Sequence, residues 1–488
     1  MPLVYLPGGN RTISVPAGTN LMDALRDAGI YLDAPCGGNG KCGKCRVIAD
    51  SREVLACRTA AHRDMTVTVP KKSGLNILHR GIAAVQKMDP LQEGYLLAFD
   101  IGTTSVVCFL LDGKTGEELA KSSMLNPQLG FGADVISRIQ AALRGELGKL
   151  TELIREAMEA MIRTVCADGD ISPEEISVVS VVGNPAMRQL FLGICPENLA
   201  AVPFAPVLTE AKAVPCRDIL PICPNARLLL VPDISGFVGA DTLGCLLSAR
   251  LYEQEEVTLL VDIGTNGEMV LGNKDRMIAC ATAAGPALEG ANIRFGMRGT
   301  AGAIDHVWLE DGEIKCSVIG GGQAKGICGS GLIDAVAVGL KLGLVNKRGR
   351  IQNQEHILPL TENIYLTQED IRQVQLAKGA ICAGIILMAK QLDLEVDAIR
   401  KVQLSGAFGS FMAPASACRI GLLPEVLLDR IEAVGNAAGS GAKLLACNQN
   451  LLPFAKELTE KIEFLELASI PAFSKIFAKA MTFREETL

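Results

Sequence analysis

Short hydrophobic runs alternate with glycine-containing turns from the first residue to Pro70. The runs "LVYLP" and "TISVP" are joined by Gly-Gly-Asn, which predicts two strands and a tight turn. "NLMDALRDAGI" has the spacing of an amphipathic helix, with Thr19 or Asn20 as its N-cap and Gly29 at its end. "CRVIAD" and "MTVTVP" predict further strands. This region is therefore expected to form a small mixed sheet with one helix.

A different pattern begins at Leu96, where longer hydrophobic runs flank an acidic turn. "LLAFDIGTTSVVCFLLD" predicts a strand, a turn and a strand, and "LLVDIGTNGEMVLGN" repeats this arrangement from Leu259. Two Asp-Ile-Gly-Thr turns in the same hairpin context indicate an internal repeat, and hence a duplicated α/β fold. Two unrelated hairpin turns are the alternative.

Glycine-rich turns that lead into helices follow the second hairpin. They are "GICGSGLIDAVA" from Gly326, "VQLSGAFGSF" from Val402 and "VGNAAGSGA" from Val434. Thr367 is expected to start another helix, with Asp370 as its capping-box partner. The C-terminal "EFLELASIPAFSKIFAKAMTF" predicts a strand and then an amphipathic packing helix.

These changes of pattern divide the chain. We expect a first domain over 1–72, a linker over 73–95 with a short helix at most, one subdomain of the duplicated fold over 96–256 and a second over 257–488. A linker of this length allows the first domain to move relative to the rest.

Composition narrows the class of protein. The 488 residues carry a formal net charge of −7, which argues against a nucleic acid partner. The chain shows no apolar run of the ~18–20 residues that a membrane helix needs, and no signal peptide pattern. A cytoplasmic protein without a membrane partner is expected, with a homodimer as a possible assembly.

Cysteine use is uneven, because four of the 16 cysteines lie close together. Cys36, Cys42, Cys45 and Cys57 have the spacing C-x5-C-x2-C-x11-C, and four glycines lie within residues 36–45. Glycines with positive φ let a loop wrap closely over a cluster. The spacing favours a 2Fe–2S site of the plant ferredoxin type, with structural zinc as the alternative. The other twelve cysteines are expected to be small buried hydrophobic residues.

The two hairpin turns have the chemistry of a nucleotide site. Asp100 and Asp262 are candidates to hold Mg²⁺ through water. Gly102, Thr103 and Thr104 in the first turn, and Gly264, Thr265 and Asn266 in the second, are candidates for binding phosphates. The adenosine side is predicted to involve Gly329, Ser330, Gly331, Gly406, Ala407, Phe408 and Gly409.

Four further residues have both a functional and a structural interpretation. Glu268 either assists an attacking water or is a polar strand residue, and Glu289 is either a functional carboxylate or an ordinary loop residue. Thr282 either faces a bound ligand, such as a phosphate, or simply starts a loop. Lys378 either reaches the nucleotide or is an exposed helix lysine. The four histidines are isolated and are not expected to bind metal.

The order of these motifs resembles the actin/Hsp70/sugar-kinase ATPase superfamily, which has a duplicated ribonuclease H-like fold. With the cysteine loop in a β-grasp pattern, the chain resembles more narrowly the reductive activators of corrinoid proteins. The stretches that carry this resemblance are "VVGNPAM" (181–187), "DISGFVGAD" (233–241), "VDIGTNGE" (261–268), "TAAGPALEGANI" (282–293), "GICGSGLIDA" (326–335), "QLAKGAI" (375–381) and "GNAAGSGA" (435–442). Larger members of the family carry an additional domain before the ATPase part, which this chain replaces with a short linker.

The resemblance implies an ATP-hydrolysing iron–sulfur reductase of a corrinoid methyl-transfer system. Its 2Fe–2S cluster would return one electron to inactive Co(II), restoring Co(I), with Mg-ATP as the second cofactor. Its partners would be a corrinoid protein and an electron donor such as a ferredoxin or flavodoxin. The alternatives are an ATP-dependent electron donor to another metalloenzyme, such as a dehydratase activator, a small-molecule kinase with a redox domain, and a non-enzymatic redox sensor.

Overall fold

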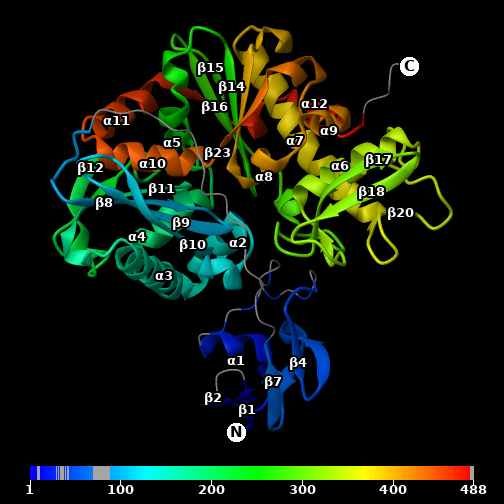
Figure 1. Ribbon diagram of the computed structural model, residues 1–488, viewed down its shortest axis with the longest axis horizontal. Coiled ribbons are helices and arrows are strands. Elements are labelled where there is room, and N and C mark those ends of the chain that lie inside the picture. Colours follow the sequence, from blue (N-terminus) through cyan, green and yellow to red (C-terminus); the bar gives the residue numbers. More distant parts are fainter. Residues whose placement is uncertain are drawn as a thin grey trace.

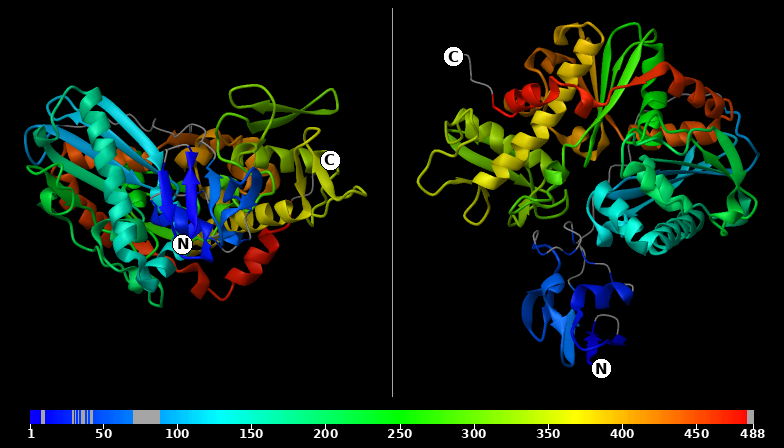
Figure 2. Two further views of the ribbon diagram at one scale, coloured as in Figure 1. Left: turned by 90° about the horizontal axis from the view of Figure 1, so that it is seen from below. Right: turned by 180° about the vertical axis from the view of Figure 1, so that it is seen from behind.

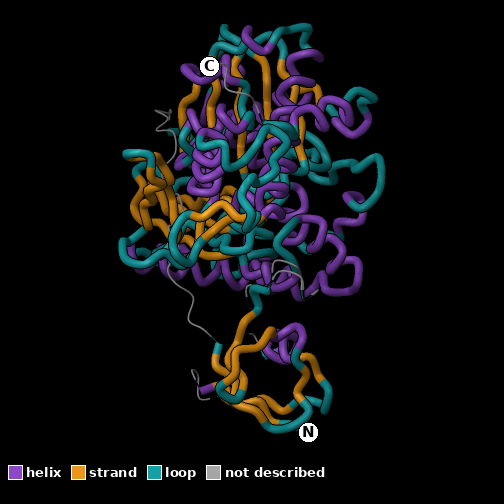
Figure 3. The backbone as a smooth tube through the Cα atoms, turned by 90° about the vertical axis from the view of Figure 1, so that its right-hand side faces the viewer, coloured by secondary structure: helices purple, strands orange, loops and turns teal. Residues whose placement is uncertain are grey.

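The computed structural model describes residues 1–7, 11–28, 30, 32, 34, 38, 40, 43–69 and 88–483. The predicted Gly-Gly-Asn turn, the helix end at Gly29 and most of the predicted linker lie outside these residues. Figure 1 shows a small N-terminal domain beneath two larger lobes, and Figure 3 shows the same separation from the side.

The N-terminal domain is a mixed sheet with one helix, as predicted. Its strands are β1 (Leu3–Leu6), β2 (Arg11–Ser14), β3 (Thr19–Asn20), β4 (Arg46–Ala49), β5 (Arg52–Leu55), β6 (Ala60–Ala61) and β7 (Met65–Thr68), and its helix is α1 (Leu21–Asp27). The main sheet has the order β2-β1-β7-β4-β5, with β1 parallel to β7. Asn20 caps α1 by accepting a hydrogen bond from the Met22 backbone N–H. Leu21 and Leu25 of α1 are fully buried, so the predicted apolar face forms the core of the β-grasp fold.

The first lobe is built on a six-stranded sheet that contains the first Asp-Ile-Gly-Thr hairpin. Its order is β10-β9-β8-β11-β13-β12. The strands are β8 (Tyr95–Ile101), β9 (Ser105–Asp112), β10 (Glu118–Leu125), β11 (Ile176–Gly183), β12 (Lys212–Pro215) and β13 (Arg227–Leu230). Its helices are α2 (Val135–Ala141), a π-helical turn (Ala142–Glu146), α3 (Leu147–Asp168), α4 (Pro185–Leu192) and α5 (Ala240–Ala249).

The second lobe repeats this sheet. Its order is β23-β22-β14-β15-β16-β24, formed by β14 (Thr258–Ile263), β15 (Gly267–Gly272), β16 (Met277–Thr282), β22 (Lys401–Ser405), β23 (Ile431–Gly435) and β24 (Ile462–Phe464). Each lobe has three antiparallel strands followed by two parallel ones, β10-β9-β8-β11-β13 and β16-β15-β14-β22-β23. The predicted duplicated α/β fold is thereby confirmed.

The second lobe also carries an insertion and most of the longer helices. The insertion holds β17 (Ala303–Glu310), β18 (Glu313–Val318), β19 (Gly326–Ile327), β20 (Ile357–Pro359) and β21 (Tyr365–Thr367). The helices are α6 (Gly329–Lys341), α7 (Gln368–Gln391), α8 (Gly406–Phe411), α9 (Pro414–Ile420), α10 (Ala437–Cys447), α11 (Leu451–Lys461) and α12 (Phe473–Ala480). Short 3-10 helices lie at Ala56–Arg58, Pro127–Phe131, Pro173–Glu175, Pro196–Leu199, Cys216–Asp218, Leu251–Glu253, Pro286–Glu289, Val396–Ala398, Glu425–Arg430 and Leu467–Ser469.

The two lobes meet where α5 and α10 cross, although these helices lie far apart in the sequence (Figure 1). A Cβ on Gly441 would lie 2.1 Å from the Gly244 carbonyl oxygen, so only glycine allows this approach. The Ser248 hydroxyl of α5 donates a hydrogen bond to the Ala437 carbonyl over 2.9 Å. One hydrophobic core includes residues of both sheets and of both helices. The crossing therefore joins the lobes and places the two Asp-Ile-Gly-Thr turns on either side of one cleft.

One helix in the described part of the chain, α7, is long and apolar enough to cross a membrane by length and composition. Its apolar window is 78% buried inside the protein. This burial is typical of a core helix of a soluble protein, in which the apolar face packs on the neighbouring sheet.

Candidate functional site

A cavity of about 590 Å³ lies between the two lobes and is lined by both hairpin turns. The first turn contributes Asp100, Gly102, Thr103 and Thr104, and the second contributes Asp262, Gly264, Thr265 and Asn266. Asp100 and Asp262 lie on equivalent first strands, β8 and β14, because the sheet is duplicated. All eight of the residues predicted in these turns therefore line one cavity.

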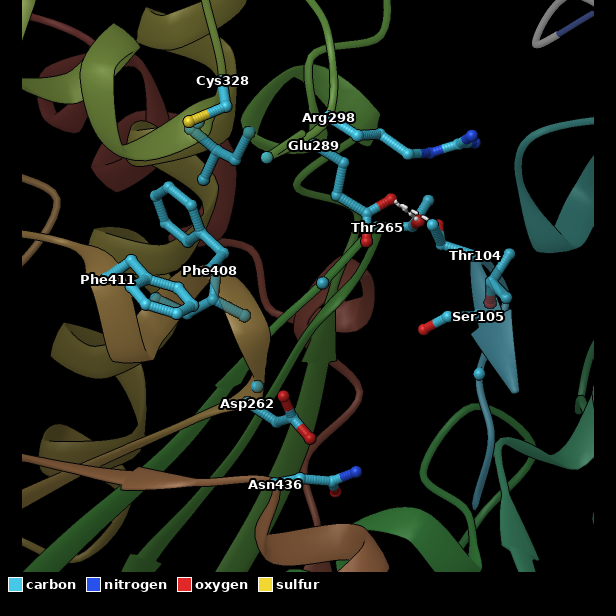
Figure 4. Close-up of a pocket in the computed structure, with 18 of the residues that line it drawn as sticks. Thr104, Ser105, Asp262, Thr265, Glu289, Arg298, Cys328, Phe408, Phe411 and Asn436 are labelled. Carbon is cyan, nitrogen blue, oxygen red and sulfur yellow. Dashed lines mark hydrogen bonds between the residues drawn. The ribbon is translucent and has the colours of Figure 1, made fainter. Parts of the chain in front are cut away.

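Glu289 connects the two turns. Its Oε2 accepts hydrogen bonds from the Thr104 hydroxyl and from the Thr265 hydroxyl, each over 2.8 Å. Figure 4 shows the carboxylate lying between the two threonines, with both bonds drawn. A phosphate group in this place would use the same two hydroxyl donors, so Glu289 occupies a position suited to a phosphate oxygen.

Four carboxyl groups gather in and around the cavity: Asp100, Asp241, Asp262 and Glu268. Burial raises the pKa of Asp100 to about 7, and the charges of Asp241 and Asp262 add to this effect. Burial and then Asp241 raise the pKa of Asp262 to about 6. Burial, followed by Asp241 and Asp262, also raises the pKa of Glu268 well above its usual range. The group carries more negative charge than its surroundings stabilise when all four side chains are ionised.

These side chains supply oxygen donors of the kind that Mg²⁺ prefers, although in the described part of the chain no three of them are arranged to hold a metal ion directly. Mg²⁺ prefers carboxylate and amide oxygens together with several waters. A bound divalent cation would favour the ionised form of each carboxyl, reversing the effect of burial. Asn436 forms a side-chain hydrogen bond with Asp100, and Asn266 forms one with Glu268. The residues present therefore fit Mg²⁺.

Asp241 was not predicted as a site residue. It lies in the first turn of α5, directly after Gly239 and Ala240, and lines the cavity. Burial raises its pKa. A carboxylate in the first turn of a helix that follows a glycine-rich loop was the available signal, within the stretch "DISGFVGAD". Its role is set by the position of α5 at the crossing of the lobes, which local sequence does not reveal.

The side of the cavity predicted for adenosine is lined in part by the predicted residues. Gly329 and Ser330 begin α6, while Gly406 and Phe408 belong to α8. Gly406 has φ +86°, and a Cβ there would lie 2.6 Å from Asp262 Oδ1. The Phe408 ring, with the unpredicted Phe411, forms one wall of the cavity (Figure 4), which suits an aromatic base.

Two other predicted residues on this side pack closely against neighbouring segments without lining the cavity. Gly331 and Gly409 are absent from the cavity lining and serve close packing. A Cβ on Gly331 would lie 2.4 Å from the Ile304 carbonyl oxygen, and one on Gly409 would lie 3.2 Å from Leu404 Cβ. The side chain of Ala407 lies outside what the structure describes.

Thr282 and Lys378 also lie away from the cavity. Thr282 is 4% exposed at the end of β16, where its hydroxyl donates to the Gly267 carbonyl over 3.2 Å. Lys378 is 1% exposed, donates to the Thr482 carbonyl and has its ammonium 5.1 Å from the Phe483 ring centre. Neither side chain lines the cavity, so both functional interpretations stay predictions, whereas the alternative of an exposed lysine is wrong because Lys378 is buried. Lys378 instead holds the C-terminal segment against α7.

Sequence reasoning also missed several polar residues around the turns. The Asn184 amide donates to the Thr103 hydroxyl over 3.1 Å, and Asn184 caps α4. Asn436 caps α10 in the same way, by accepting from the Gly439 N–H. Arg298 extends into the cavity (Figure 4). An asparagine before a helix was the only local signal for the first two, and it predicts a cap without indicating a ligand.

The second site is the cysteine loop of the N-terminal domain. The Cys45 and Cys57 sulfur atoms lie 3.2 Å apart, while Cys36 and Cys42 lie outside the described residues. Gly38, Gly40 and Gly43 have φ of +92°, +70° and +66°, as expected for a loop that wraps a cluster. The Asn20 amide donates to the Cys57 carbonyl over 2.9 Å. The described half of the loop therefore fits an iron–sulfur cluster held by thiolates.

The remaining cysteines behave as predicted. Of the twelve, all but Cys195 and Cys316 are buried. Burial raises the pKa of the Cys216 thiol to about 12 and of the Cys447 thiol to about 11. These thiols are therefore protonated at neutral pH and act as small hydrophobic residues.

Comparison with protein families places each part of the chain. Residues 4–68 match the 2Fe-2S iron-sulfur cluster binding domain, residues 95–254 match the RACo middle region, and residues 256–488 match the C-terminal domain of RACo, the ASKHA domain. The predictions of a 2Fe–2S cluster and of an ATPase of the actin superfamily type, with ATP and Mg²⁺ as cofactors, are thereby confirmed.

Individual relatives agree with these matches. The corrinoid activation enzyme RamQ of Eubacterium limosum is 37% identical over 81% of this chain and 71% of its own length. The [Co(II) methylated amine-specific corrinoid protein] reductase of Methanosarcina barkeri is 28% identical over 80% of this chain and 77% of its own. A solved structure, the reductive activator for corrinoid, iron-sulfur protein, has a TM-score of 0.75 at 28% identity and covers 99% of this chain and 98% of its own. The chain therefore belongs to the family of reductive activators of corrinoid proteins.

Proposed function

We propose that this protein reduces the cobalt of a corrinoid protein from Co(II) to Co(I) and uses ATP to drive the transfer. The observation that supports this most directly is the combination, in one chain, of a cysteine-loop domain and a cleft in which two Asp-Ile-Gly-Thr turns meet. A sugar kinase has no use for the first, and a simple ferredoxin has no use for the second. The relatives named for corrinoid activation align with 81% and 80% of this chain.

ATP is needed because the reduction potential of the cobalt couple lies below the potentials of ordinary electron donors. The transfer of the electron is therefore unfavourable by itself. Clusters of the plant ferredoxin type have potentials near roughly −400 mV. Each ~59 mV by which the cobalt couple lies below the cluster reduces the equilibrium constant tenfold for one electron. Binding of the nucleotide at the cleft can offset this cost only if it favours one state of the complex over another.

Different residues of the cleft have different roles in binding and hydrolysing the nucleotide. The turn N–H groups and the hydroxyls of Thr104 and Thr265 bind the phosphates. Asp100 and Asp262 would hold Mg²⁺ through water, and the ion would neutralise charge on the phosphate oxygens. Glu268 lines the cavity and, in its ionised form, is placed to accept a proton from an attacking water; burial raises its pKa, which makes the carboxylate a stronger base. Phe408 contacts the base.

The partner is a corrinoid protein whose cobalt has been inactivated by one-electron oxidation during methyl transfer. The cluster is recharged by a low-potential carrier such as a ferredoxin or a flavodoxin. We infer that the protein acts in the cytoplasm. The short segment between the N-terminal domain and the first lobe lets the cluster approach the bound corrinoid.

The proposal is tested by the absorbance spectrum of a methyl-transfer corrinoid protein in its Co(II) form. We expect anaerobic mixing with this protein, a chemical reductant and Mg-ATP to produce Co(I) at least tenfold faster than the same mixture without ATP. The Cys45→Ser variant should hydrolyse ATP without producing Co(I), and Asp262→Asn should keep the iron–sulfur spectrum but lose the ATP effect. ATP hydrolysis with unchanged Co(II) in the wild type would refute the proposal.

A further inference from the structure

The N-terminal domain contacts both ATPase lobes at the mouth of the cleft. From α1, the Arg26 guanidinium donates to the Gly130 carbonyl over 2.9 Å and lies 4.7 Å from the centre of the Phe131 ring, both in the first lobe. From the cysteine loop, the Lys44 ammonium donates to the Gly296 carbonyl in the second lobe. Figure 2 shows the N-terminal domain centred over the two lobes when they are seen from below.

These contacts are suited to a reversible association. Among the described residues they include two hydrogen bonds from flexible cationic side chains to backbone carbonyls and one cation–π contact, and the hydrophobic core of the N-terminal domain contains no residue of either lobe. Domain interfaces that lack a large apolar area allow relative motion of the domains. Lys44 lies between Cys42 and Cys45, so this association brings the cluster loop itself against the second lobe.

The lobe segment that Lys44 contacts belongs to a compact loop over residues 286–298, which starts in the cleft. Glu289 lies between Thr104 and Thr265, as described above. Its neighbour Gly290 packs on the far end of the loop, where a Cβ would lie 2.4 Å from the Met297 carbonyl oxygen. A Cβ on Gly296 would lie 2.2 Å from the Gly290 carbonyl oxygen. Because these backbones are in direct contact, a shift at Glu289 is transmitted to Gly296.

We propose that the surface formed by Gly130, Phe131 and the Gly296 carbonyl is a docking site for the chain's own N-terminal domain, and that nucleotide releases it through the loop 286–298. The inference rests on the proposed binding of nucleotide in the cleft. Phosphate oxygens take the two threonine hydroxyls and repel the Glu289 carboxylate. Glu289 then leaves its position, the loop shifts with it, and Lys44 loses the Gly296 carbonyl.

The released domain is free to carry its cluster to the corrinoid partner, while the docked domain keeps the cluster against the ATPase lobes. The electron is thereby withheld from other acceptors until nucleotide is bound. The opposite arrangement, in which nucleotide strengthens docking and the docked form transfers the electron, is an outcome that the experiment below distinguishes.

The test is small-angle X-ray scattering on the full-length, cluster-containing protein under anaerobic conditions, with and without Mg-AMPPNP. We expect the radius of gyration of the wild type to increase when the nucleotide is added. Arg26→Ala should have the larger radius without nucleotide and should not expand further. Arg63→Ala is the matched control, because Arg63 is a largely exposed arginine of the same domain whose ion pair is with Asp50, 3.6 Å away. It should behave like the wild type.

A second variant tests the link through the loop. Glu289→Ala removes the carboxylate that joins the two threonines, so it should have the larger radius without nucleotide. A Glu289→Ala protein that stays compact and expands normally with Mg-AMPPNP would show that Glu289 is not the link.

Calorimetry of Mg-AMPPNP binding on the same samples separates this inference from the proposed function. An unchanged or smaller radius in a wild-type sample saturated with nucleotide overturns nucleotide-driven release and leaves the function of the cleft standing. A compact Arg26→Ala protein overturns the docking site. Failure of the wild type to bind nucleotide at all overturns the proposed use of the cleft, and the coupling with it. The iron–sulfur absorbance of each variant verifies that its cluster is intact.

Discussion

At the scale of single residues, the site depends on how two hydroxyl groups and a few carboxyl groups are shared between the lobes. Thr104 and Thr265 come from different lobes yet donate to the same oxygen of Glu289. Hydrogen bonds to a charged acceptor contribute about 1.5–3 kcal/mol each, more than bonds between neutral groups. A phosphate that replaces Glu289 gains the same two donors.

Thr104→Val and Thr265→Val test this sharing, because valine keeps the shape of threonine and removes the hydroxyl. We expect each variant to bind Mg-AMPPNP about tenfold or more weakly, as measured by calorimetry. Thr282→Val is the control, since the Thr282 hydroxyl points to the Gly267 carbonyl and not into the cavity. A weakened affinity in the control, or an unchanged one in both test variants, would contradict the assignment of the turns.

The carboxyl cluster predicts a particular dependence of stability on pH. The pKa values of Asp100 and Asp262 are about 7 and about 6, both above the usual value for aspartate. The folded protein therefore binds more protons than the unfolded chain between pH 4 and 7, and the stabilisation from protonation is lost as the pH rises through 6 and 7. In EDTA and without nucleotide, the melting temperature of the lobes should fall between pH 5 and pH 8.

Asp100→Asn should reduce this fall, because its amide does not ionise. Differential scanning calorimetry at several pH values is the measurement. The same slope in wild type and variant would mean that Asp100 is already ionised at pH 5 in the folded protein. Saturating Mg-ATP should also reduce the fall in the wild type, since the cation favours the ionised carboxylates.

At the scale of elements, local sequence predicted much of what the structure contains. Both hairpins, the capped helix at Thr367 and the final strand and helix all follow from hydrophobic spacing and end signals. Asp241 and Asn184 were missed because each starts a helix that only the order of the strands brings to the cleft. Lys378 was misjudged because the C-terminal segment that covers it follows about a hundred positions later in the chain. Pairing over such sequence distances leaves no local pattern.

The crossing of α5 and α10 is the element contact that tolerates the least change. In Gly441→Ala the new methyl group would lie 2.1 Å from a backbone oxygen that cannot move away without displacing α5. We expect the free energy of unfolding to fall by about 1–3 kcal/mol or more, which would lower the melting temperature of the lobes. Gly148→Ala is the control, because this helical glycine has nothing within 4 Å of its Cβ position.

In the control Gly148→Ala, the free energy of unfolding should rise by about 0.5–1 kcal/mol, because alanine has a better helix propensity than glycine. Equal melting temperatures for Gly441→Ala and the wild type would show that the helices can separate at little cost. The lobes would then not be joined in the way described here.

At the scale of the whole molecule, a small iron–sulfur domain contacts an ATPase part that has two lobes. The composition of the chain and its two sets of motifs were sufficient to predict both parts and their order. The docking contacts were not predictable, because Arg26 and Lys44 are cationic residues in ordinary sequence contexts and their acceptors are backbone carbonyls. Such contacts depend on where the folded lobes present their loops, and not on the type of residue that presents the oxygen.

The central claim is that ATP permits one electron to pass from the cluster to cobalt. It is tested most directly by reducing this protein with one electron per cluster, removing the excess reductant and mixing it anaerobically with a Co(II) corrinoid protein. With Mg-ATP, the account predicts that cluster oxidation and Co(I) formation appear together and in equal amounts, one Co(I) for each cluster. Without ATP, both absorbance signals should stay unchanged. Equal formation of Co(I) with and without ATP, or cluster oxidation with no Co(I), would contradict the account.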